Sequence, residues 1–218
     1  MTPAATRLAA ILEGIAAAAN HARRGPSEVT LVAVSKTRSA EEIEALIDAG
    51  QRDFGESRVQ ETLGKWPEIR SRHAQIRLHG IGRLQSNKAA EAVALFDTIH
   101  SLDRSSLLDA LVAAGEKAER FPEVFVQVAI GDEEQKGGVA LADLPQFLET
   151  VRSSPLPLVG LMAIPPLGVE PAPYFALLAK LGARHGLARL SMGMSGDYRA
   201  AVMLGATEVR IGSALFED

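Results

Sequence analysis

Short apolar, β-branched runs alternate with amphipathic helical patterns along the whole chain of 218 residues. This alternation is typical of parallel βα units, because parallel strands need a crossover segment between them. Eight strands are predicted, at residues 31–35, 53–55, 77–81, 98–101, 124–130, 159–164, 190–192 and 208–212. Eight units of about 27 residues each use up the chain, so we expect one (β/α)₈ TIM-type barrel that forms a single domain over residues 1–218.

One more helix is expected before the first strand, within the alanine-rich residues 4–19. Four apolar residues share one face of that helix, namely Leu8, Ile11, Leu12 and Ile15. Arg7 and Glu13 interrupt the apolar run, so it does not have the pattern of a secretory signal.

Local signals also mark where helices begin and end. Ser39 followed by Glu42 predicts a capping box, and Gly50 predicts the end of the same helix. Ser86 is expected to be the N-cap of a helix over residues 87–96. Two further glycines are expected to end helices, at Gly186 and Gly205.

An open, doubly wound sheet would give a similar alternation, and periodicity alone does not separate the two architectures. The first predicted strand is not followed by the G-x-G-x-x-G sequence that a dinucleotide-binding sheet would carry there. The barrel is therefore the favoured fold.

Composition excludes several classes of partner. Twenty-three Lys and Arg stand against 27 Asp and Glu, and a net charge of −4 offers no basic field for nucleic acid. Without cysteine there is neither a disulfide framework nor a thiolate metal site, and the five histidines have no metal-ligand spacing. No apolar run reaches the roughly 20 residues that span a bilayer, so a cytoplasmic protein with no membrane partner is expected.

Lys36 is the clearest candidate for chemistry. It follows the apolar run of the first strand, and the active face of a TIM barrel lies at the C-terminal ends of its strands. No acidic residue stands directly beside it, and partial desolvation there would favour the neutral amine that attacks an aldehyde. A surface lysine at a strand end is the alternative that position alone favours.

The last two strands end in loops that suit a phosphate group. Arg210, Gly212 and Ser213 combine a cation, a glycine that permits close backbone approach and a hydroxyl. Ser195 follows the seventh strand in a similar glycine-rich loop, just before a helix N-terminus. Each loop alone is a weak signal, and their adjacency predicts a phosphorylated ligand.

Two further segments carry polar groups at strand ends. His79 lies at the end of the third strand, where it could approach a ligand ring at the barrel mouth or be a hydrogen-bonded core histidine. Residues 54–58 could supply polar groups to the same mouth or cap the following helix.

Six motifs together resemble the pyridoxal phosphate homeostasis proteins. They are Val-Ser-Lys-Thr at 34–37, Phe-Gly-Glu-Ser-Arg-Val-Gln-Glu at 54–61, His-Gly-Ile-Gly-Arg-Leu-Gln-Ser-Asn-Lys at 79–88, Gly-Leu-Met-Ala-Ile-Pro at 160–165, Leu-Ser-Met-Gly-Met-Ser at 190–195 and Val-Arg-Ile-Gly-Ser at 209–213. The resemblance implies a barrel like the N-terminal domain of alanine racemase. It also implies binding of pyridoxal 5′-phosphate (PLP) as a Schiff base on Lys36, with buffering or delivery of the cofactor and no established turnover.

The resemblance assigns roles residue by residue. Arg210 would face the pyridine nitrogen, and Ser195, Gly212 and Ser213 would hold the phosphate. The chain departs from the family pattern in three places. It has Ser57 in place of Asn, Ala129 in place of Asn, and Gly137 in place of Ser in the segment Lys136-Gly137-Gly138. Apoenzymes that depend on PLP would be possible recipients.

Two other functions stay open at this point. A small PLP-dependent racemase needs a second acid or base, which in the resembling racemases is a tyrosine from an additional domain of the partner subunit. The tyrosines here, Tyr174 and Tyr198, are not placed in that way, and no additional domain is expected. An enzyme that forms an imine between Lys36 and a free phosphorylated metabolite is the weaker alternative. For Arg210, the competing interpretation is a structural ion pair with Glu208 or Glu56.

Overall fold

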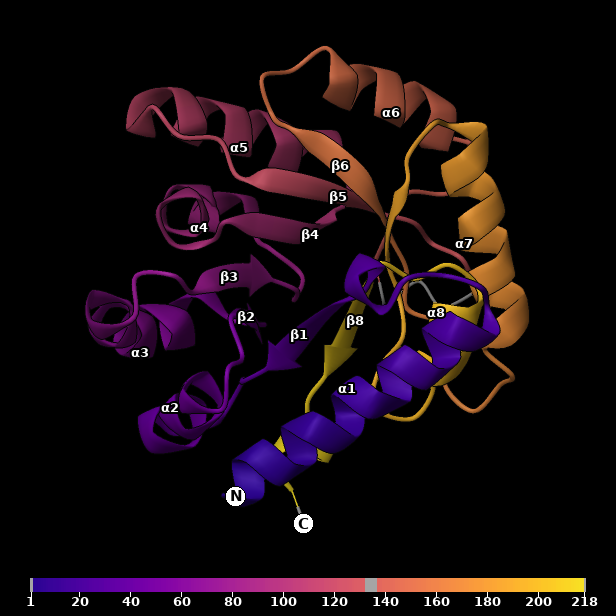
Figure 1. The fold of residues 1–218 in the computed structure, drawn as a ribbon. Coiled ribbons are helices and arrows are strands. Elements are labelled where there is room, and N and C mark those ends of the chain that lie inside the picture. The colour runs from indigo at the N-terminus through magenta and orange to yellow at the C-terminus, as the bar shows by residue number, and fades with distance from the viewer. Residues whose placement is uncertain (1, 132–136, 218) are drawn as a thin grey trace.

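Eight parallel strands close into a barrel in the order β1 to β8, with β8 paired to β1 (Figure 1). This computed structural model describes residues 2–131 and 137–217. The strands are β1 Thr30–Val34, β2 Asp53–Glu56, β3 Arg77–Gly80, β4 Thr98–Leu102, β5 Glu123–Gln127, β6 Leu158–Met162, β7 Arg189–Ser191 and β8 Glu208–Ile211. The predicted TIM-type fold is confirmed, and the open-sheet alternative is excluded because the sheet has no free edge.

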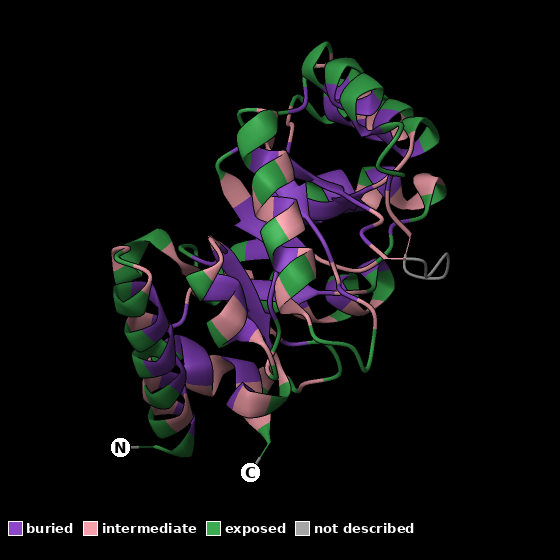
Figure 2. Ribbon diagram, turned by 90° about the vertical axis from the view of Figure 1, so that its right-hand side faces the viewer, coloured by how far each residue is buried: buried purple, intermediate pink, exposed green. Residues whose placement is uncertain are grey.

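Helices surround the barrel and connect its strands. They are α1 Pro3–His21, α2 Ala40–Asp48, α3 Val59–Arg72, α4 Ala89–Leu95, α5 Ser105–Ala118, α6 Leu144–Arg152, α7 Ala172–Arg184, α8 Tyr198–Met203 and α9 Ser213–Phe216, with short 3₁₀ turns η1 Pro26–Glu28 and η2 Ser86–Lys88. The faces of these helices that meet the strands are buried, and their outer faces are exposed (Figure 2). Among the described residues, no helix is long and apolar enough to cross a membrane.

Helix α1 lies outside the barrel against the C-terminal part of the chain (Figure 1). Three of the four predicted apolar contacts are buried, at Leu8, Ile11 and Ile15. Leu12 is 47% exposed, so its assignment to the buried face was wrong. The side chain of Leu12 lies beside the narrow face of α1 that packs against the rest of the protein, and not on that face. The Nε of Arg7 donates to the carbonyl oxygen of Leu215 at 2.8 Å and so joins α1 to α9.

The predicted helix signals hold with one exception. Ser39 and Glu42 form the capping box, and Gly50 adopts a φ of +108° after α2. Ser86 is not an N-cap, because it begins the 3₁₀ turn and α4 starts only after Lys88. The hydroxyl of Ser86 instead accepts a hydrogen bond from Arg104, at 3.2 Å, so a tertiary contact replaces the local one.

The fifth strand is shorter at its end than its apolar run suggested. Strand β5 ends at Gln127, and Val128 then forms an isolated β-bridge with Val139. The amide of Ala129 donates to the carbonyl oxygen of Val139 at 2.9 Å. The amide of Val128 still donates to Met162 of β6 at 2.9 Å, and the amide of Val139 donates to the carbonyl oxygen of Gln127 at 2.8 Å. The regular strand therefore ends where Val139 begins to share its backbone hydrogen bonds.

Inside the barrel, the layer nearest the N-terminal ends of the strands is ionic. The carboxylate of Glu123 accepts from Arg189 at 2.9 Å and from Arg77 at 3.1 Å. The Nε of Arg189 also donates to Glu208, at 2.7 Å. This chain of charges closes the end of the barrel that is opposite to the predicted site, and it satisfies the carboxylate of Glu208, which is only 2% exposed.

The buried face of α1 predicts a sharp contrast between two substitutions on one helix. Ile15→Ala removes a side chain that is 2% exposed and should lower the free energy of unfolding by about 2–5 kcal/mol. Leu12→Ala is the matched control and should change it by less than about 0.5 kcal/mol. Urea unfolding followed by circular dichroism measures both. Equal effects would show that α1 does not pack as described.

Candidate functional site

Four of the six predicted site residues follow three neighbouring strands of the barrel. Lys36 comes two residues after β1, Gly212 and Ser213 come directly after β8, and Ser195 lies in the loop after β7. Since β7 pairs with β8 and β8 with β1, barrel closure brings these loops together at the C-terminal rim. Residues from opposite ends of the chain therefore share one sector of the rim.

The backbone on both sides of Lys36 is held by side chains from β2 and α3. The hydroxyl of Ser35 donates to the buried Glu56 Oε1 at 2.7 Å, and Lys65 Nζ donates to the carbonyl oxygen of Ser35 at 2.9 Å. On the other side, the amide of Thr37 donates to the carboxylate of Glu61. Lys36 itself is exposed. The expected desolvation of its amine is therefore not seen, but its backbone position is fixed.

Glu56 belongs to this support and not to the barrel mouth. Its Oε1 also accepts from Trp66 Nε1 at 2.8 Å and pairs with Lys65 at 2.9 Å. The side chain is 0% exposed and lies between β1, β2 and α3. The chain does not cap α3 with a side chain either, because Arg58 at the N-cap makes no such hydrogen bond. Neither expected role for residues 54–58 therefore describes Glu56.

Gly212 lies directly against the first strand. A Cβ added there would stand 3.4 Å from Val34 Cβ, which is ordinary van der Waals contact, and the φ of Gly212 is −115°. The backbone at this position does not itself require glycine. A glycine here leaves the main chain of the β8 loop open to close approach by a ligand.

The two serines of the predicted phosphate loops have free hydroxyls. In the described part of the chain, neither the Ser195 nor the Ser213 side chain has a hydrogen-bond partner. Ser195 sits in a tight turn, in which Asp197 Oδ1 accepts from the amide of Met194 at 2.6 Å. Both hydroxyls are thus available to a ligand at the rim.

Arg210 lies inside the barrel beneath this rim. It is 5% exposed, its Nη1 donates to Ser191 Oγ at 2.6 Å, and its Nη2 donates to the carbonyl oxygen of Ala163 at 3.1 Å. These two partners mark the C-terminal ends of β7 and β6. Burial lowers the pKa of Arg210 to about 10, against the opposing influence of Asp197 and Glu208, so the group is still a cation at neutral pH.

No carboxylate forms an ion pair with Arg210 among the described residues. Glu208 pairs with Arg189, and Glu56 pairs with Lys65. The competing interpretation of Arg210 as a structural ion pair is therefore wrong. A guanidinium group has five N–H donors, and only two hydrogen bonds to protein are formed here.

His79 occupies the barrel core. It is 1% exposed, its Nε2 lies 3.0 Å from Asp53 Oδ1, and its Nδ1 lies 3.0 Å from His100 Nε2. Both ring nitrogens are thus engaged by protein groups. Of the two alternatives for this residue, the structure favours the hydrogen-bonded core histidine.

His100 connects His79 to Arg210 and is not among the residues that the sequence indicated. Its Nδ1 lies 2.7 Å from Ser191 Oγ, and its ring stacks on Phe125 with centroids 4.5 Å apart. Burial lowers the pKa of His100 well below its ordinary value, and nearby His79, Arg210 and Arg189 act in the same direction. Residues 98 and 100 are two positions apart in one strand, so their side chains face the same side of the sheet. This spacing was a signal that both side chains face inward.

The three departures from the family pattern have different surroundings. The Ser57 backbone packs so closely on Gly82 that a Cβ added to Gly82 would stand 2.2 Å from the Ser57 carbonyl oxygen. Ala129 is held by its backbone bond to Val139. Gly137 has a φ of +70°, a conformation that glycine adopts more readily than serine. Lys136 lies outside the described residues.

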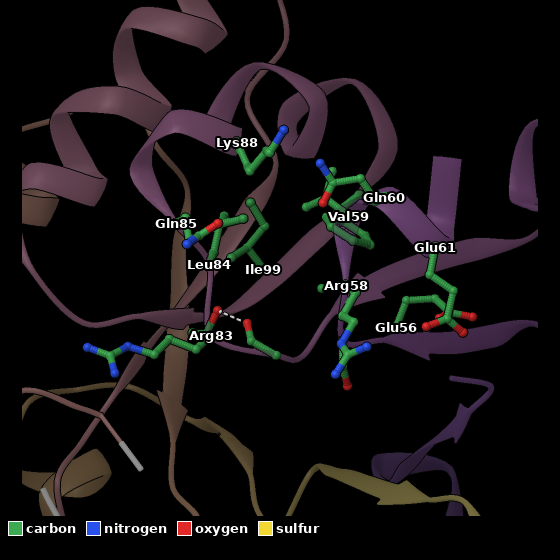
Figure 3. A pocket seen from close by; sticks show the side chains of 15 residues that line it. Glu56, Arg58, Val59, Gln60, Glu61, Arg83, Leu84, Gln85, Lys88 and Ile99 are labelled. Carbon is green, nitrogen blue, oxygen red and sulfur yellow. Dashed lines mark hydrogen bonds between the residues drawn. The ribbon is translucent and has the colours of Figure 1, made fainter. Parts of the chain in front are cut away.

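A separate pocket of about 480 Å³ opens on the helix side of β2 to β4, between the start of α3 and η2 (Figure 3). Most of its lining comes from two of the six motifs, 54–61 and 79–88, and Phe96, Ile99 and Ser101 complete it. Lys88 and Gln60 lie at one end, and the guanidinium groups of Arg58 and Arg83 lie at the other (Figure 3). None of the six predicted site residues lines this pocket. Within the described residues, no group of three or more acidic or histidine side chains could hold a metal ion.

Comparisons with known proteins agree with this architecture. The family model of the alanine racemase N-terminal domain matches residues 6–218. The chain is also 42% identical over 206 residues to the pyridoxal phosphate homeostasis protein of Synechocystis sp., which covers 88% of this chain and 93% of that protein. The protein of the same name from Pseudomonas aeruginosa is 41% identical, with 99% of this chain and 96% of the relative covered.

The chain therefore belongs to the pyridoxal phosphate homeostasis proteins, within the class of alanine racemase N-terminal barrels. A solved structure supports the same assignment. PipY of Synechococcus elongatus PCC7942, determined with PLP bound, is 37% identical with a TM-score of 0.85. The match covers 98% of this chain and 99% of PipY. The resemblance seen in the six motifs is confirmed.

Proposed function

We propose that this protein binds PLP as a Schiff base on Lys36 and takes part in PLP homeostasis inside the cell, by buffering the cofactor or delivering it to apoenzymes. One observation carries the proposal: an exposed lysine, two free serine hydroxyls and an open glycine backbone follow three adjacent strands. PLP has an aldehyde and a phosphate, and this set offers an amine for the first and hydrogen-bond donors for the second. The names of the relatives and the PLP bound to PipY support the same ligand.

The proposed covalent step needs no other reactant. The neutral Lys36 amine adds to the aldehyde carbon, the carbonyl oxygen leaves as water, and a C=N bond forms. Hydrolysis reverses the step and releases the aldehyde unchanged. The role of the protein is to hold the lysine backbone in place, and the hydrogen bonds at Ser35 and Thr37 fit that role.

We assign Arg210 to the pyridine nitrogen of the ligand. The guanidinium group is buried at the C-terminal level of β6 and β7, with donors left over from its two protein bonds. A cation opposite the ring nitrogen keeps that nitrogen unprotonated, and the ring is then a weak electron sink. Carbanion chemistry is discouraged, which suits a carrier better than a catalyst.

The placement of the tyrosines also argues for a non-catalytic role. Racemisation by two bases needs one group on each side of the substrate Cα. Tyr198 is buried and its hydroxyl accepts from Arg199 at 3.2 Å, next to Gly14 of α1. Tyr174 lies on α7 near Gly131. Tyr198 packs against α1, and Tyr174 lies beside the loop after β5.

The first test locates the covalent bond. Borohydride reduction of the PLP-loaded protein, followed by peptide mass mapping, should place the pyridoxyl adduct on Lys36 and not on Lys88 or Lys136. Lys36→Ala should abolish the adduct, whereas the matched control Lys88→Ala should leave it unchanged, because Lys88 lines the other pocket. An adduct that persists in Lys36→Ala would contradict the assignment.

The second test concerns the phosphate group. Gly212→Ala should keep the free energy of unfolding within about 0.5 kcal/mol, since the new methyl group meets only ordinary contacts. It should weaken PLP binding about 10- to 100-fold, the range of one lost charge-assisted hydrogen bond. Binding of pyridoxal, which has no phosphate, should be weak and unchanged. Titration of the ligand absorbance measures both aldehydes, and equal affinity of the variant and the parent for PLP would place the phosphate elsewhere.

The third test asks whether the protein turns over amino acids. We expect no optical inversion when the PLP-loaded protein is incubated with L- or D-alanine, because no second base is assigned. Chiral chromatography over several hours detects slow conversion. Robust inversion that disappears in Lys36→Ala would establish the racemase alternative.

A further inference from the structure

A continuous chain of hydrogen bonds crosses the barrel core from Arg210 to the N-terminal end of β2. The successive contacts are Arg210 to Ser191 at 2.6 Å, Ser191 to His100 at 2.7 Å, His100 to His79 at 3.0 Å and His79 to Asp53 at 3.0 Å. The three middle side chains are each no more than 1% exposed. Asp53 is the first residue of β2 and its side chain is 22% exposed.

Both ends of this chain fix the direction of its hydrogen bonds. A guanidinium group only donates, and a carboxylate only accepts. With neutral imidazoles, Arg210 therefore donates to Ser191, the Ser191 hydroxyl donates to His100 Nδ1, and the remaining protons follow the same direction. His100 Nε2 then donates to His79 Nδ1, and His79 Nε2 donates to Asp53. The tautomers are assigned here from the partners of each ring.

The opposite direction cannot satisfy the same groups. An extra proton on His79 would make its Nδ1 a donor, and His100 would then donate to Ser191 instead of accepting from it. The Ser191 hydroxyl would receive two hydrogen bonds, and within the described residues its own proton would have no acceptor. Leaving a buried polar group unpaired is costly, so the fold selects one direction.

We propose that Ser191, His100, His79 and Asp53 are positioning residues that hold the Arg210 cation toward the ligand ring and supply its counter-charge at the far end of the barrel. The proposal rests on the proposed function, in which Arg210 faces the pyridine nitrogen. Each group between Arg210 and Asp53 accepts one hydrogen bond and donates the next. The guanidinium group and the carboxylate are thus connected without a direct ion pair. A direct carboxylate would occupy N–H donors that the two protein hydrogen bonds leave over.

The stacked ring explains why a histidine suits the middle of the chain. His100 packs face to face on Phe125, with an angle of 21° between the rings, while the His79 ring is tilted by 59° to it. The stacking fixes the plane of the imidazole, and both nitrogens then point along the chain. A glutamine at this position can also accept with its oxygen and donate with its nitrogen, whereas a phenylalanine can only stack.

The test compares the visible absorbance of bound PLP and its dissociation constant among variants of the PLP-loaded protein. His100→Phe and Ser191→Ala should shift the absorbance band and weaken binding about 3- to 10-fold, the range of one lost hydrogen bond. His100→Gln should restore the parent band. Ser101→Ala is the matched control, because Ser101 is a buried serine outside the chain whose hydroxyl donates to Gly82, and it should leave the band unchanged.

The outcomes separate this proposal from the proposed function. Parent-like bands in both His100→Phe and Ser191→Ala would overturn the positioning role while leaving Lys36 as the PLP-binding residue. Equal shifts in His100→Gln and His100→Phe would show that the shape of the imidazole matters and not the direction of its hydrogen bonds. If His100→Phe does not fold, Ser191→Ala alone decides, since it removes a single oxygen atom. Failure of the parent to bind PLP would instead refute the proposed function.

Discussion

The pairing of β8 with β1 is the interaction on which the rest of the structure depends. Four consecutive residue pairs, from Thr30 with Glu208 to Ala33 with Ile211, close the sheet on itself. The closure removes both sheet edges and places the loop of Lys36 beside the loop of Gly212 and Ser213. Without this pairing, the loop after β1 and the loop after β8 would not be neighbours.

The inside of the barrel is divided into levels with different chemistry. The N-terminal level is made of paired charges around Glu123 and Arg189, and the middle level contains buried hydrogen-bonded groups around His100. The cation of Arg210 lies above them, close to the rim. Glu123 and Glu208 at the lower level are paired with Arg189, and the hydrogen bonds of Arg210 go to Ser191 and Ala163.

The sequence predicted the elements well because their signals are local. Eight alternating apolar runs, the capping box at Ser39 and the glycines at helix ends all depend on neighbours within a few residues. The errors arose where distant segments compete. Arg104 donates a hydrogen bond to the hydroxyl of Ser86, and the backbone of Val139 forms hydrogen bonds with the backbone at the end of the fifth strand. A single sequence does not reveal either contact.

The positions of the candidate residues in the fold were predictable to the same degree. The residues that end the first, seventh and eighth strands could be found, because barrel topology places all strand ends on one rim. The surroundings of His79 and Glu56 could not be found in this way, since they depend on the register between strands and on side chains of α3. His100 carried a weak signal in its strand parity, but its partners Ser191 and His79 come from two other strands.

Thr37, the residue after Lys36, has a left-handed backbone that is held by a side chain of α3. A β-branched residue at a φ of +63° costs about 1–3 kcal/mol, and such a conformation persists only where its surroundings impose it. Here the carboxylate of Glu61, in the first turn of α3, holds the amide of Thr37. The same turn forms one wall of the pocket in Figure 3. The pocket wall and the backbone next to Lys36 therefore share one carboxylate, and Lys65 of α3 adds a second contact at the carbonyl oxygen of Ser35.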